Sequence, residues 1–464
     1  MNTRTQIQWD HDLIQRYNIS GPRYTSYPTA VQFTDQFGEA EYRAAAQRSV
    51  EADGPLSLYF HIPFCDTICF YCGCNKIATK DTAKAEPYLE RVYKEIEMQA
   101  ALANAENRQV KQLHWGGGTP TFLSHDQMRQ LMAKTREAFN LQGNDEGDFS
   151  IEIDPREATG ETMELLRELG FNRVSLGVQD FNADVQKAVN RIQSEEMTQD
   201  ILDHSRRLGF RSLNIDLIYG LPLQTVATFS ETLETIIKMS PDRISVFNYA
   251  HLPERFKPQR RIKDEEIPEP SVKLQILEHT INRLVEAGYV YIGMDHFAKP
   301  DDSLSVAQRE GKLHRNFQGY TTHSDCDLIA MGVSSISQQA NTYSQNAYTI
   351  DEYESFIDNG KLAVIKGLEL SDDDILRRSV INQIICHFEL DGDNFSRDFN
   401  INFDSYFKEE LEFLQQHHRD GLIDLSGNKL KVTPAGRLLV RAVCMAFDKY
   451  LDKKALTQSY SRII

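Results

Sequence analysis

Four of the seven cysteines lie within ten residues of one another, with the spacing Cys65-x3-Cys69-x2-Cys72-x-Cys74. The N-terminal residues lack the apolar core of a signal peptide, so we expect a cytoplasmic protein whose thiols stay reduced. In that compartment a tight cysteine cluster indicates a metal site rather than disulfide bonds. Structural zinc sites usually use two close pairs separated by a long loop, and ferredoxin clusters use other spacings. The spacing fits neither pattern well. A zinc site or a chance grouping of cysteines is therefore only the alternative to a different kind of metal site.

Polar and glycine-rich residues also recur directly after short runs of strand-forming residues. The cysteine segment 61–76 follows the first run, and the segment GGGTP at 116–120 follows the second. The third run ends in Glu152 and Asp154, and the fifth ends at Asp216. Gln179 and Asp180 follow the fourth run, and Tyr249, Ala250 and His251 follow the sixth. The carboxyl ends of parallel strands carry the chemistry in α/β folds, so we expect one shared active site at this edge. For any single acidic residue the alternative is a helix N-cap after its strand.

The elements that must position these residues alternate between strand and helix. Strand-forming runs occur at residues 56–62, 110–115, 149–154, 172–177, 211–217 and 242–248. Helical stretches lie between most of them, at 82–104, 124–139, 158–169, 196–209 and 226–239. This alternation predicts βαβ units in a parallel sheet, and six units favour a curled sheet or an incomplete barrel. Two later runs, 289–295 and 328–333, extend or cap the sheet in this interpretation.

Both ends of the chain differ from this central part. The segment GPRYTSYPTA at 21–30 predicts an ordered arm rather than a helix. After about residue 345, helical segments at 373–388 and 404–418 precede a hairpin around residues 426–428 and a helix that starts near Pro434. We therefore predict an N-terminal arm at 1–35, a catalytic barrel at 36–345 and a mostly helical, winged-helix-like domain at 346–464.

The charge and hydropathy of the chain argue against two classes of function. Of its 464 residues, 51 are Lys or Arg and 68 are Asp or Glu, which gives a net charge of −17. Such acidity argues against a protein that binds a nucleic-acid backbone, and the acidic segment 404–418 is a poor DNA recognition helix. No run of about 18 apolar residues occurs, so we expect no transmembrane helix.

The triplet Cys65-x3-Cys69-x2-Cys72 resembles the cluster motif of the radical S-adenosylmethionine (SAM) superfamily. In that pattern three thiolates hold a [4Fe–4S] cluster whose fourth iron stays open for SAM. The segments RYTSYPTA, HIPFC, LHWGGGTPT, IEIDPRE, LGVQDFN, NIDLIYGLP, GMDHFA, HRNFQGYTT and MGVSSIS resemble those of the oxygen-independent coproporphyrinogen III oxidase family, from about residue 8 to the C-terminus. The resemblance implies an α/β fold, namely an incomplete (β/α)6 barrel with an N-terminal arm and a C-terminal, largely helical domain.

The resemblance also implies a reaction, the oxidative decarboxylation of two propionates of coproporphyrinogen III to vinyls, which gives protoporphyrinogen IX. In the family a 5′-deoxyadenosyl radical made from SAM abstracts hydrogen from a propionate β-carbon, and the substrate radical then loses CO2 and one electron. The implied cofactors are a [4Fe–4S] cluster and two SAM molecules. The implied partners are a flavodoxin-like electron donor protein and an unidentified electron acceptor, with no nucleic acid, no membrane and a monomeric chain.

The family's functional residues carry over to matching positions of this sequence. Cys65, Cys69 and Cys72 resemble the cluster ligands. The contacts to the cluster-bound SAM match Tyr59, Gly117 and Glu152. The contacts to the second SAM match Tyr71, Gly118, Thr119, Gln179, Arg191, Asp216, Ala250 and Ile336. The residues that we expect to act in catalysis are Tyr59, His61, Glu152 and Cys74.

Some of these assignments have a structural alternative. For Ala250 and Ile336, packing in the core is the simpler explanation. His61 either tunes the cluster or is a strand-end histidine with a backbone contact. Cys74 is either a functional neighbour of the cluster or a structural cysteine, because a fourth ligand would close the position that SAM needs.

A substrate with four propionates needs cations, even on an acidic protein. The candidates are Arg23 in the arm, Arg315, and the run Arg255, Lys257, Arg260, Arg261 and Lys263. For most of this run a solvated surface is the simpler interpretation.

A haem carrier and a haem-opening methyltransferase of the same superfamily are rival functions. The continuation Cys74-Asn75-Lys76 and the RYTSYPTA arm favour the enzyme over the carrier.

Overall fold

The computed structural model describes residues 7–143, 145–451 and 462–464, and the chain divides into two compact units. Unit 1 gathers Met1–Gln32, Leu284–Ser324 and Leu370–Ile464, and unit 2 gathers Phe33–Arg283 and Asp325–Glu369. Each unit is therefore assembled from segments that are distant in the sequence. Within the described ranges, no helix is both long and apolar enough to cross a membrane.

Unit 2 is built on a large, mainly parallel sheet. Its first six long strands are β1 (Leu56–Ile62), β4 (Gln109–Gly117), β6 (Asp148–Ile153), β7 (Arg173–Gln179), β8 (Ser212–Tyr219) and β9 (Arg243–Asn248). They pair in parallel in the order β9-β8-β7-β6-β4-β1, which confirms the six predicted strands and their shared direction.

The other edge of this sheet continues beyond β1. Strand β14 (Asp327–Met331) pairs with β1 in parallel, so the predicted run 328–333 does extend the sheet. Three further antiparallel strands follow, β15 (Ile336–Gln339), β16 (Thr342–Asn346) and β17 (Val364–Glu369). These three strands were not predicted, because polar residues interrupt their apolar pattern.

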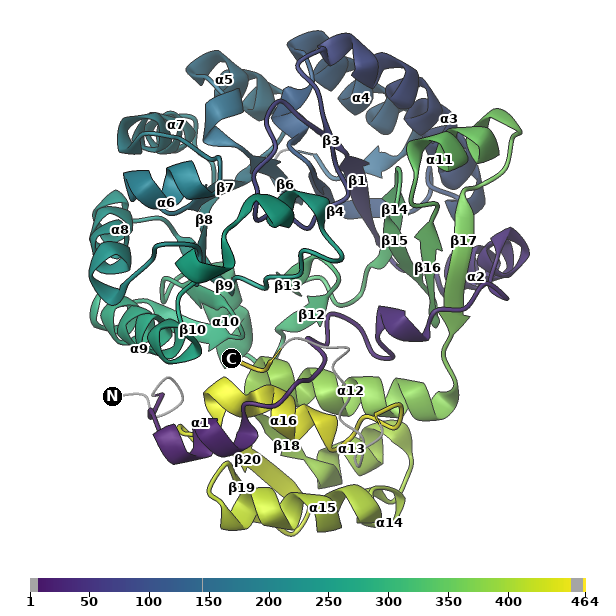
Figure 1. Cartoon of the computed structure of the whole chain (residues 1–464). Helices are drawn as coiled ribbons and strands as arrows, with labels where there is room; N and C mark the ends of the chain where they lie inside the picture. The colour runs from purple at the N-terminus through teal and green to yellow at the C-terminus, as the bar shows by residue number, and fades with distance from the viewer. Residues whose placement is uncertain (1–6, 144, 452–461) are drawn as a thin grey trace. The chain divides into compact units, whose positions relative to one another are not determined.

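Helices connect the parallel strands and lie outside the curved sheet, as Figure 1 shows. They are α3 (Ala85–Ala103), α4 (His125–Ala138), α5 (Gly160–Glu168), α6 (Ala183–Ala188), α7 (Glu195–Arg207) and α8 (Val226–Met239). A Ser or Thr side chain caps the start of four of them and accepts a backbone N–H three residues on: Ser124, Thr159, Ser194 and Thr225. Local capping therefore fixes where each helix begins after its strand.

The alternation of side chains along the strands separates the core from the site. In β7, Val174, Leu176 and Val178 are buried, whereas the alternate residues Ser175 and Gln179 line a cavity. Each fully buried side chain of this size stabilises the fold by about 1.5–3 kcal/mol. Successive side chains of a strand point to opposite faces, so the same strand anchors the apolar layer under the helices and presents polar groups inside.

Unit 1 contains both ends of the chain. Its central and C-terminal segments form β10 (Val290–Gly293), β11 (His296–Ala298), α10 (Ser303–Arg309), β12 (His314–Asn316), β13 (Gly319–Thr321), α12 (Asp372–His387), α13 (Gly392–Phe399), α15 (Lys408–Arg419) and α16 (Val440–Met445). A small antiparallel sheet has the order β18-β20-β19, made of Glu389–Asp391, Lys429–Val432 and Ile423–Ser426. Helices followed by this hairpin are the predicted winged-helix-like arrangement.

Two predicted helices of unit 1 are wrong in their bounds. The segment 404–418 forms two helices, α14 (Phe403–Tyr406) and α15, with Phe407 between them. Phe407 is fully buried and its ring lies 4.9 Å from that of Phe403, so packing overrides the helical pattern. The helix expected near Pro434 starts later, as a 3-10 turn at Arg437–Leu439 that leads into α16.

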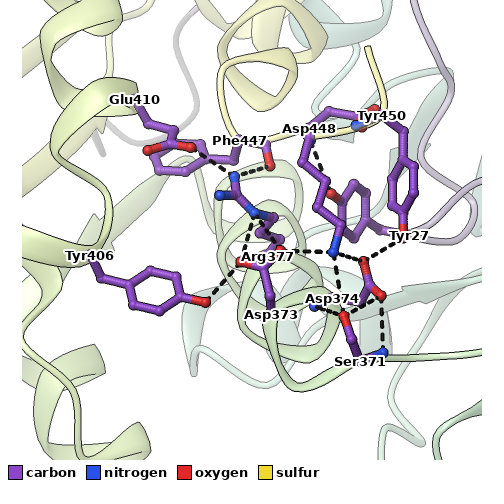
Figure 2. A network of polar contacts seen from close by, with 11 residues as sticks. Tyr27, Ser371, Asp373, Asp374, Arg377, Tyr406, Glu410, Phe447, Asp448 and Tyr450 are labelled. Carbon is purple, nitrogen blue, oxygen red and sulfur yellow. Dashed lines mark hydrogen bonds and ion pairs between the residues drawn. The ribbon is translucent and has the colours of Figure 1, made fainter.

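The N-terminal arm packs with the C-terminal segment inside unit 1. The Tyr24 hydroxyl donates to Asp448 at 3.0 Å, and the backbone N–H of Lys449 donates to the Tyr27 hydroxyl at 3.1 Å. The backbone N–H of Ile463 donates to Ile19 O at 2.9 Å. Figure 2 shows the polar network around Arg377, which includes Asp448 and Tyr450 of the C-terminal segment and Tyr27 of the arm.

Candidate active site

A cavity of about 210 Å³ lies at the carboxyl ends of the parallel strands of unit 2. Most of the predicted site residues line it: Cys65, Cys69, Tyr71, Cys72, Cys74, Gly117, Gly118, Thr119, Glu152, Gln179, Arg191 and Asp216. They come from the loop after β1 and from the ends of β4, β6, β7 and β8, together with Arg191 after α6. The shared edge predicted from the strand-end residues therefore forms one cavity at the ends of β1, β4, β6, β7 and β8, whereas the residues that follow β9 do not line it.

Four predicted site residues do not line this cavity. Tyr59 and His61 lie on β1, where the Tyr59 hydroxyl is 3.1 Å from His61 Nδ1, and His61 Nε2 is 3.0 Å from the carbonyl of Asn75. Ala250 is exposed, so the expectation that it packs in the core is wrong. Ile336 is half-buried at the start of β15.

The cysteine loop is closed by a short parallel pairing of Phe64–Cys65 with Ile77–Ala78, and all seven cysteines of the chain are free thiols. A hydrogen bond from the Cys74 thiol, and then the charge of Lys76, outweigh burial and lower the pKa of Cys72 to about 6. Burial, reinforced by Cys72 and Cys69, raises the pKa of Cys65 to about 12. A metal that binds this loop must therefore displace at least one proton, because thiolates are the ligands.

Cys69 has a different environment, formed by two arginines. Nη2 of Arg156 and Nη1 of Arg191 each donate to Cys69 Sγ at 3.5 Å. Asp154 Oδ2 accepts from both of these nitrogens, at 2.6 Å and 2.9 Å. Arg156 was not predicted as a site residue, because an arginine that follows an acidic residue at a strand end is typical of an ordinary ion pair.

The glycine loop leaves space that a side chain would fill. Gly117 has φ of +117°, and a Cβ there would lie 2.8 Å from the His61 ring. A Cβ on Gly118 would lie 2.5 Å from the backbone oxygen of Phe64. Backbone is thus the only surface that these two positions present to the cavity.

Two carboxylates on neighbouring strands differ in their ionisation. Burial raises the pKa of Asp216, although Ser175 Oγ and Asn214 Nδ2 each donate to it at 2.8 Å. Burial also acts on Glu152, but the His114 ring and the backbone N–H of Gly117 outweigh it and hold the pKa of Glu152 below its usual value. The Glu152 side chain is 46% exposed, because it faces the cavity rather than the packed interior.

The cavity contains polar atoms that no described residue satisfies. Gln179 Oε1 and Arg191 Nε are buried without a hydrogen-bond partner among the described residues. Gln179 also has φ of +70°, a strained backbone for a residue with a side chain. An unpaired donor and acceptor, a backbone-only cradle and three free thiols together fit a [4Fe–4S] cluster and SAM, which carries a carboxylate, an amino group and ribose hydroxyls.

Other strand-end residues have structural roles. Asp180 is buried, accepts from Gln224 and Thr232, and caps the turn before α6 through the N–H of Asn182. Asp180 therefore has a structural role, but it is not the predicted helix N-cap, because Asn182 caps α6. His251 bonds the hydroxyl of Tyr249 and a carboxylate oxygen of Asp264, at 2.7 Å and 2.9 Å.

The candidate cations fall into three different environments. The basic segment, residues 255–263, packs on the cysteine loop: a Cβ on Gly73 would lie 3.1 Å from the Phe256 ring, Gln259 Nε2 donates to Tyr71 O at 2.9 Å, and the Arg261 guanidinium lies 5.1 Å from the Phe70 ring centroid. In unit 1, Arg23 is paired with Asp295 at 2.9 Å. Arg315, also in unit 1, is 6% exposed.

Comparisons with known proteins agree with this geometry. The family model of the radical SAM superfamily matches residues 59–236, and that of the HemN C-terminal domain matches residues 370–439. The oxygen-independent coproporphyrinogen III oxidase of Pseudomonas aeruginosa is 55% identical over 99% of both chains, and that of Escherichia coli is 51% identical over 99% of both. A solved structure described as coproporphyrinogen III oxidase (HemN) from Escherichia coli, a radical SAM enzyme, has a TM-score of 0.91 and 49% identity, and the match covers 96% of this chain and 100% of that one. The chain therefore belongs to the oxygen-independent coproporphyrinogen III oxidase family of the radical SAM superfamily.

Proposed function

We propose that this chain is an oxidoreductase that converts two propionates of coproporphyrinogen III to vinyls without oxygen and so forms protoporphyrinogen IX. The observation that carries the proposal is the cavity, which brings three free thiols, a glycine cradle and the unpaired groups of Arg191 and Gln179 together. Relatives that bear the name of this oxidase match the chain over 99% of its length, which supports the same reaction.

In this proposal Cys65, Cys69 and Cys72 are the cluster ligands, and two SAM molecules bind at this open cavity. When bound, the cluster and SAM supply a one-electron cleavage whose radical product takes a hydrogen atom from the propionate β-carbon. The backbone of Gly117 and Gly118 admits the methionine part of SAM. This region needs no side chain, and a Cβ would block it.

The polar side chains orient SAM. Arg191 Nε is free to donate to a carboxylate, and the carboxylates of Glu152 and Asp216 accept from ribose hydroxyls. Gln179, Tyr71 and Thr119 complete the contacts to the second SAM in this proposal, and Ala250 and Ile336 are assigned to it by family position alone.

Three further residues support the reaction without being ligands. A hydrogen bond from the Cys74 thiol lowers the pKa of Cys72, and we assign Cys74 as a neighbour of the cluster rather than a fourth ligand. His61 connects the hydroxyl of Tyr59 to the backbone of Asn75 and fixes the end of the cysteine loop. Tyr59 and His61 are therefore positioning residues in this proposal.

The reaction requires partners that exchange electrons. We assign the donor to an acidic, flavodoxin-like protein, because the basic segment presents exposed cations directly against the cysteine loop. A separate acceptor takes the electron that each decarboxylated propionate releases. We also propose a monomer that works in the reducing cytoplasm, which the seven free cysteines support.

The test is reconstitution of the cluster under anaerobic conditions, followed by addition of SAM, a reductant, an electron acceptor and coproporphyrinogen III. We expect protoporphyrinogen IX, detected after oxidation to the porphyrin. The Cys69→Ser variant should lose the cluster and the activity, whereas Cys326→Ser, which changes a cysteine outside the cavity, should keep both. Haem binding by a reconstituted protein that forms no product would instead identify a haem carrier.

A further inference from the structure

Arg315 lies on a hairpin of unit 1 formed by β12 and β13, in register with Tyr320 of the partner strand. Its backbone is anchored to Asn382 of α12, which accepts from the N–H of Arg315 and donates to its carbonyl, both at 3.3 Å. The guanidinium carbon lies 4.8 Å from the centroid of the Tyr320 ring. The arginine is therefore held at both its backbone and its side chain.

The guanidinium of Arg315 has no anion among the described residues. The side chain is 6% exposed, and its Nε and Nη1 atoms are buried and donate to no described acceptor. Arginine stays charged in proteins, and a buried charge that is neither paired nor hydrogen-bonded costs several kcal/mol. The contact with Tyr320 offsets only part of that cost, so this arrangement indicates a missing ligand.

The same hairpin carries a second unsatisfied donor. Gln318, in the turn between β12 and β13, has a buried Nε2 without a described partner. The unsatisfied side-chain atoms of Arg315 and Gln318 are all N–H donors, and none is an acceptor. The complement of such a set is a group with several acceptor oxygens and negative charge, and a planar carboxylate matches the guanidinium fork.

The neighbouring charges of unit 1 agree with an anion at this hairpin. Asp295 is already paired with Arg23 at 2.9 Å. The donors of Arg441 are satisfied by the backbone oxygens of Pro22, Arg462 and Ile463. Burial is the main cause that lowers the pKa of Arg441 to about 10, and the charges of Arg23 and Arg315 add to this lowering while that of Asp295 opposes it.

We propose that the β12–β13 hairpin is a carboxylate-binding site in which Arg315, assisted by Gln318, receives a propionate of the substrate. This inference rests on the proposed function for the identity of the carboxylate. The structure thereby separates the candidate cations, since Arg23 has a protein carboxylate, the basic segment is largely solvent-exposed, and Arg315 is buried and lacks an anion.

The test measures equilibrium binding of coproporphyrin III, the unreactive oxidised tetracarboxylate, by fluorescence quenching under anaerobic conditions. Arg315→Met should weaken binding about 10- to 100-fold, the size expected for loss of a charged hydrogen-bonded pair. Arg315→Lys should recover part of this loss, and the neutral tetramethyl ester should bind wild type and Arg315→Met equally. In turnover, Arg315→Met should raise KM more than it lowers kcat.

Arg309→Met is the control, because Arg309 is an exposed arginine of unit 1 whose Nη1 donates to the backbone oxygen of Pro300 at 2.7 Å. It should bind coproporphyrin III like wild type. Folded Arg315→Met with wild-type affinity for coproporphyrin III would overturn the proposal. A second result would also overturn it. If sodium propionate raises the Tm of wild type but not that of Arg315→Met, while the two proteins bind the porphyrin with equal affinity, then the hairpin binds a carboxylate that does not come from the substrate. Wild-type protein that binds the porphyrin but makes no product would count against the proposed function alone.

Discussion

Among the three cysteines proposed as ligands, Cys69 is the one to which arginine side chains donate. Arg156 and Arg191 each donate to its sulfur at 3.5 Å, and Asp154 holds both guanidinium groups. Hydrogen bonds to cluster sulfurs stabilise the reduced, more negative state and so raise the reduction potential. Arg191 also faces the cavity with an unpaired Nε, so its replacement would affect SAM binding as well. Arg156 contacts only Asp154 and Cys69 in this group, so its replacement tests the hydrogen bond to Cys69 alone.

We predict that Arg156→Met makes the cluster harder to reduce and slows SAM cleavage about 10-fold or more, as is typical when a partner of a metal ligand is removed. The potential is measured by redox titration monitored by electron paramagnetic resonance, without substrate. Arg156→Lys keeps one charged donor, so its reduction potential should lie between those of wild type and Arg156→Met. The control is Arg206→Met, because Arg206 donates to the backbone oxygen of Ser240 on the outer side of the barrel. A wild-type potential in Arg156→Met with full cluster content would contradict this role.

At the level of the elements, the start of α12 illustrates how a local signal is tied to distant residues. Ser371 caps the helix, and Asp374 Oδ2 accepts from the N–H and the hydroxyl of Ser371 at 3.0 Å and 2.6 Å. The other carboxylate oxygen accepts from Tyr450 at 3.0 Å and is 2.8 Å from the Lys449 ammonium (Figure 2). One buried carboxylate thus joins the capping box of α12 to the segment after α16.

We predict that Asp374→Asn lowers the free energy of unfolding by about 1–3 kcal/mol at pH 7, since it removes a hydrogen-bonded buried charge. Burial raises the pKa of Asp374, but Lys449 and Ser371 outweigh burial and hold it below the usual 3.8. A carboxylate with a depressed pKa contributes stability above its unfolded pKa and loses it as pH falls through the folded value. The difference between wild type and variant should therefore be constant from about pH 7 to 5 and shrink below about pH 4.

Denaturant unfolding at several pH values measures this difference. Asp372→Asn is the matched control, because Asp372 is exposed in the same helical turn, and it should change stability by less than about 0.5 kcal/mol. An unchanged difference between wild type and Asp374→Asn at pH 3 would contradict the assignment.

The elements also show how far sequence patterns reach. The six parallel strands and the helices between them were predictable, because strand-forming residues alternate with polar ones along most of the strands and Ser or Thr caps mark the helix starts. The strand ends likewise predicted a cavity that contains most of the named site residues. The break at Phe407 was not predictable, because the burial of that ring is a tertiary effect. The roles of Arg156 and Arg315 depend on which atoms lie nearby, and spacing along the chain does not contain that information.

At the level of the whole molecule, unit 1 depends on segments from opposite ends of the chain. The Arg441 side chain is 2% exposed, and its donors reach the backbone oxygens of Gly21 and Pro22 in the arm. The backbone of Ser20 also forms an isolated antiparallel bridge with that of Arg462. Deletion of residues 1–32 would leave a buried guanidinium without these acceptors.

We predict that this deletion destabilises unit 1 by at least about 3 kcal/mol, because charged hydrogen bonds are worth roughly 1.5–3 kcal/mol each. Hydrogen exchange should show reduced protection in α12 and α16. Because the loss acts through Arg441, the deletion should cost less in an Arg441→Met background than in wild type, which is the signature of coupled sites. Equal costs in both backgrounds would show that Arg441 is not the connection.

The net charge of −17 makes the basic segment unusual on this molecule. Arg255, Lys257 and Arg260 are exposed, and none of the ion pairs between described residues involves them. Neighbouring contacts tie this segment to the loop that carries the three proposed cluster ligands. An acidic electron donor would be attracted here and would approach the cluster, whereas the overall charge would repel it elsewhere.

We predict that the triple variant Arg255→Glu, Lys257→Glu, Arg260→Glu lowers the rate of cluster reduction by reduced flavodoxin at least about 10-fold at low salt, with a weaker dependence on ionic strength. Reduction by dithionite, a small molecule, should stay near the wild-type rate, and the KM for coproporphyrinogen III with dithionite should not change. Stopped-flow absorbance measures both reductions. Arg129→Glu and Lys134→Glu on α4 are the control, since both are surface residues outside this segment. If KM rises while reduction by flavodoxin is unaffected, these cations bind the substrate propionates instead, and the donor must approach through another surface.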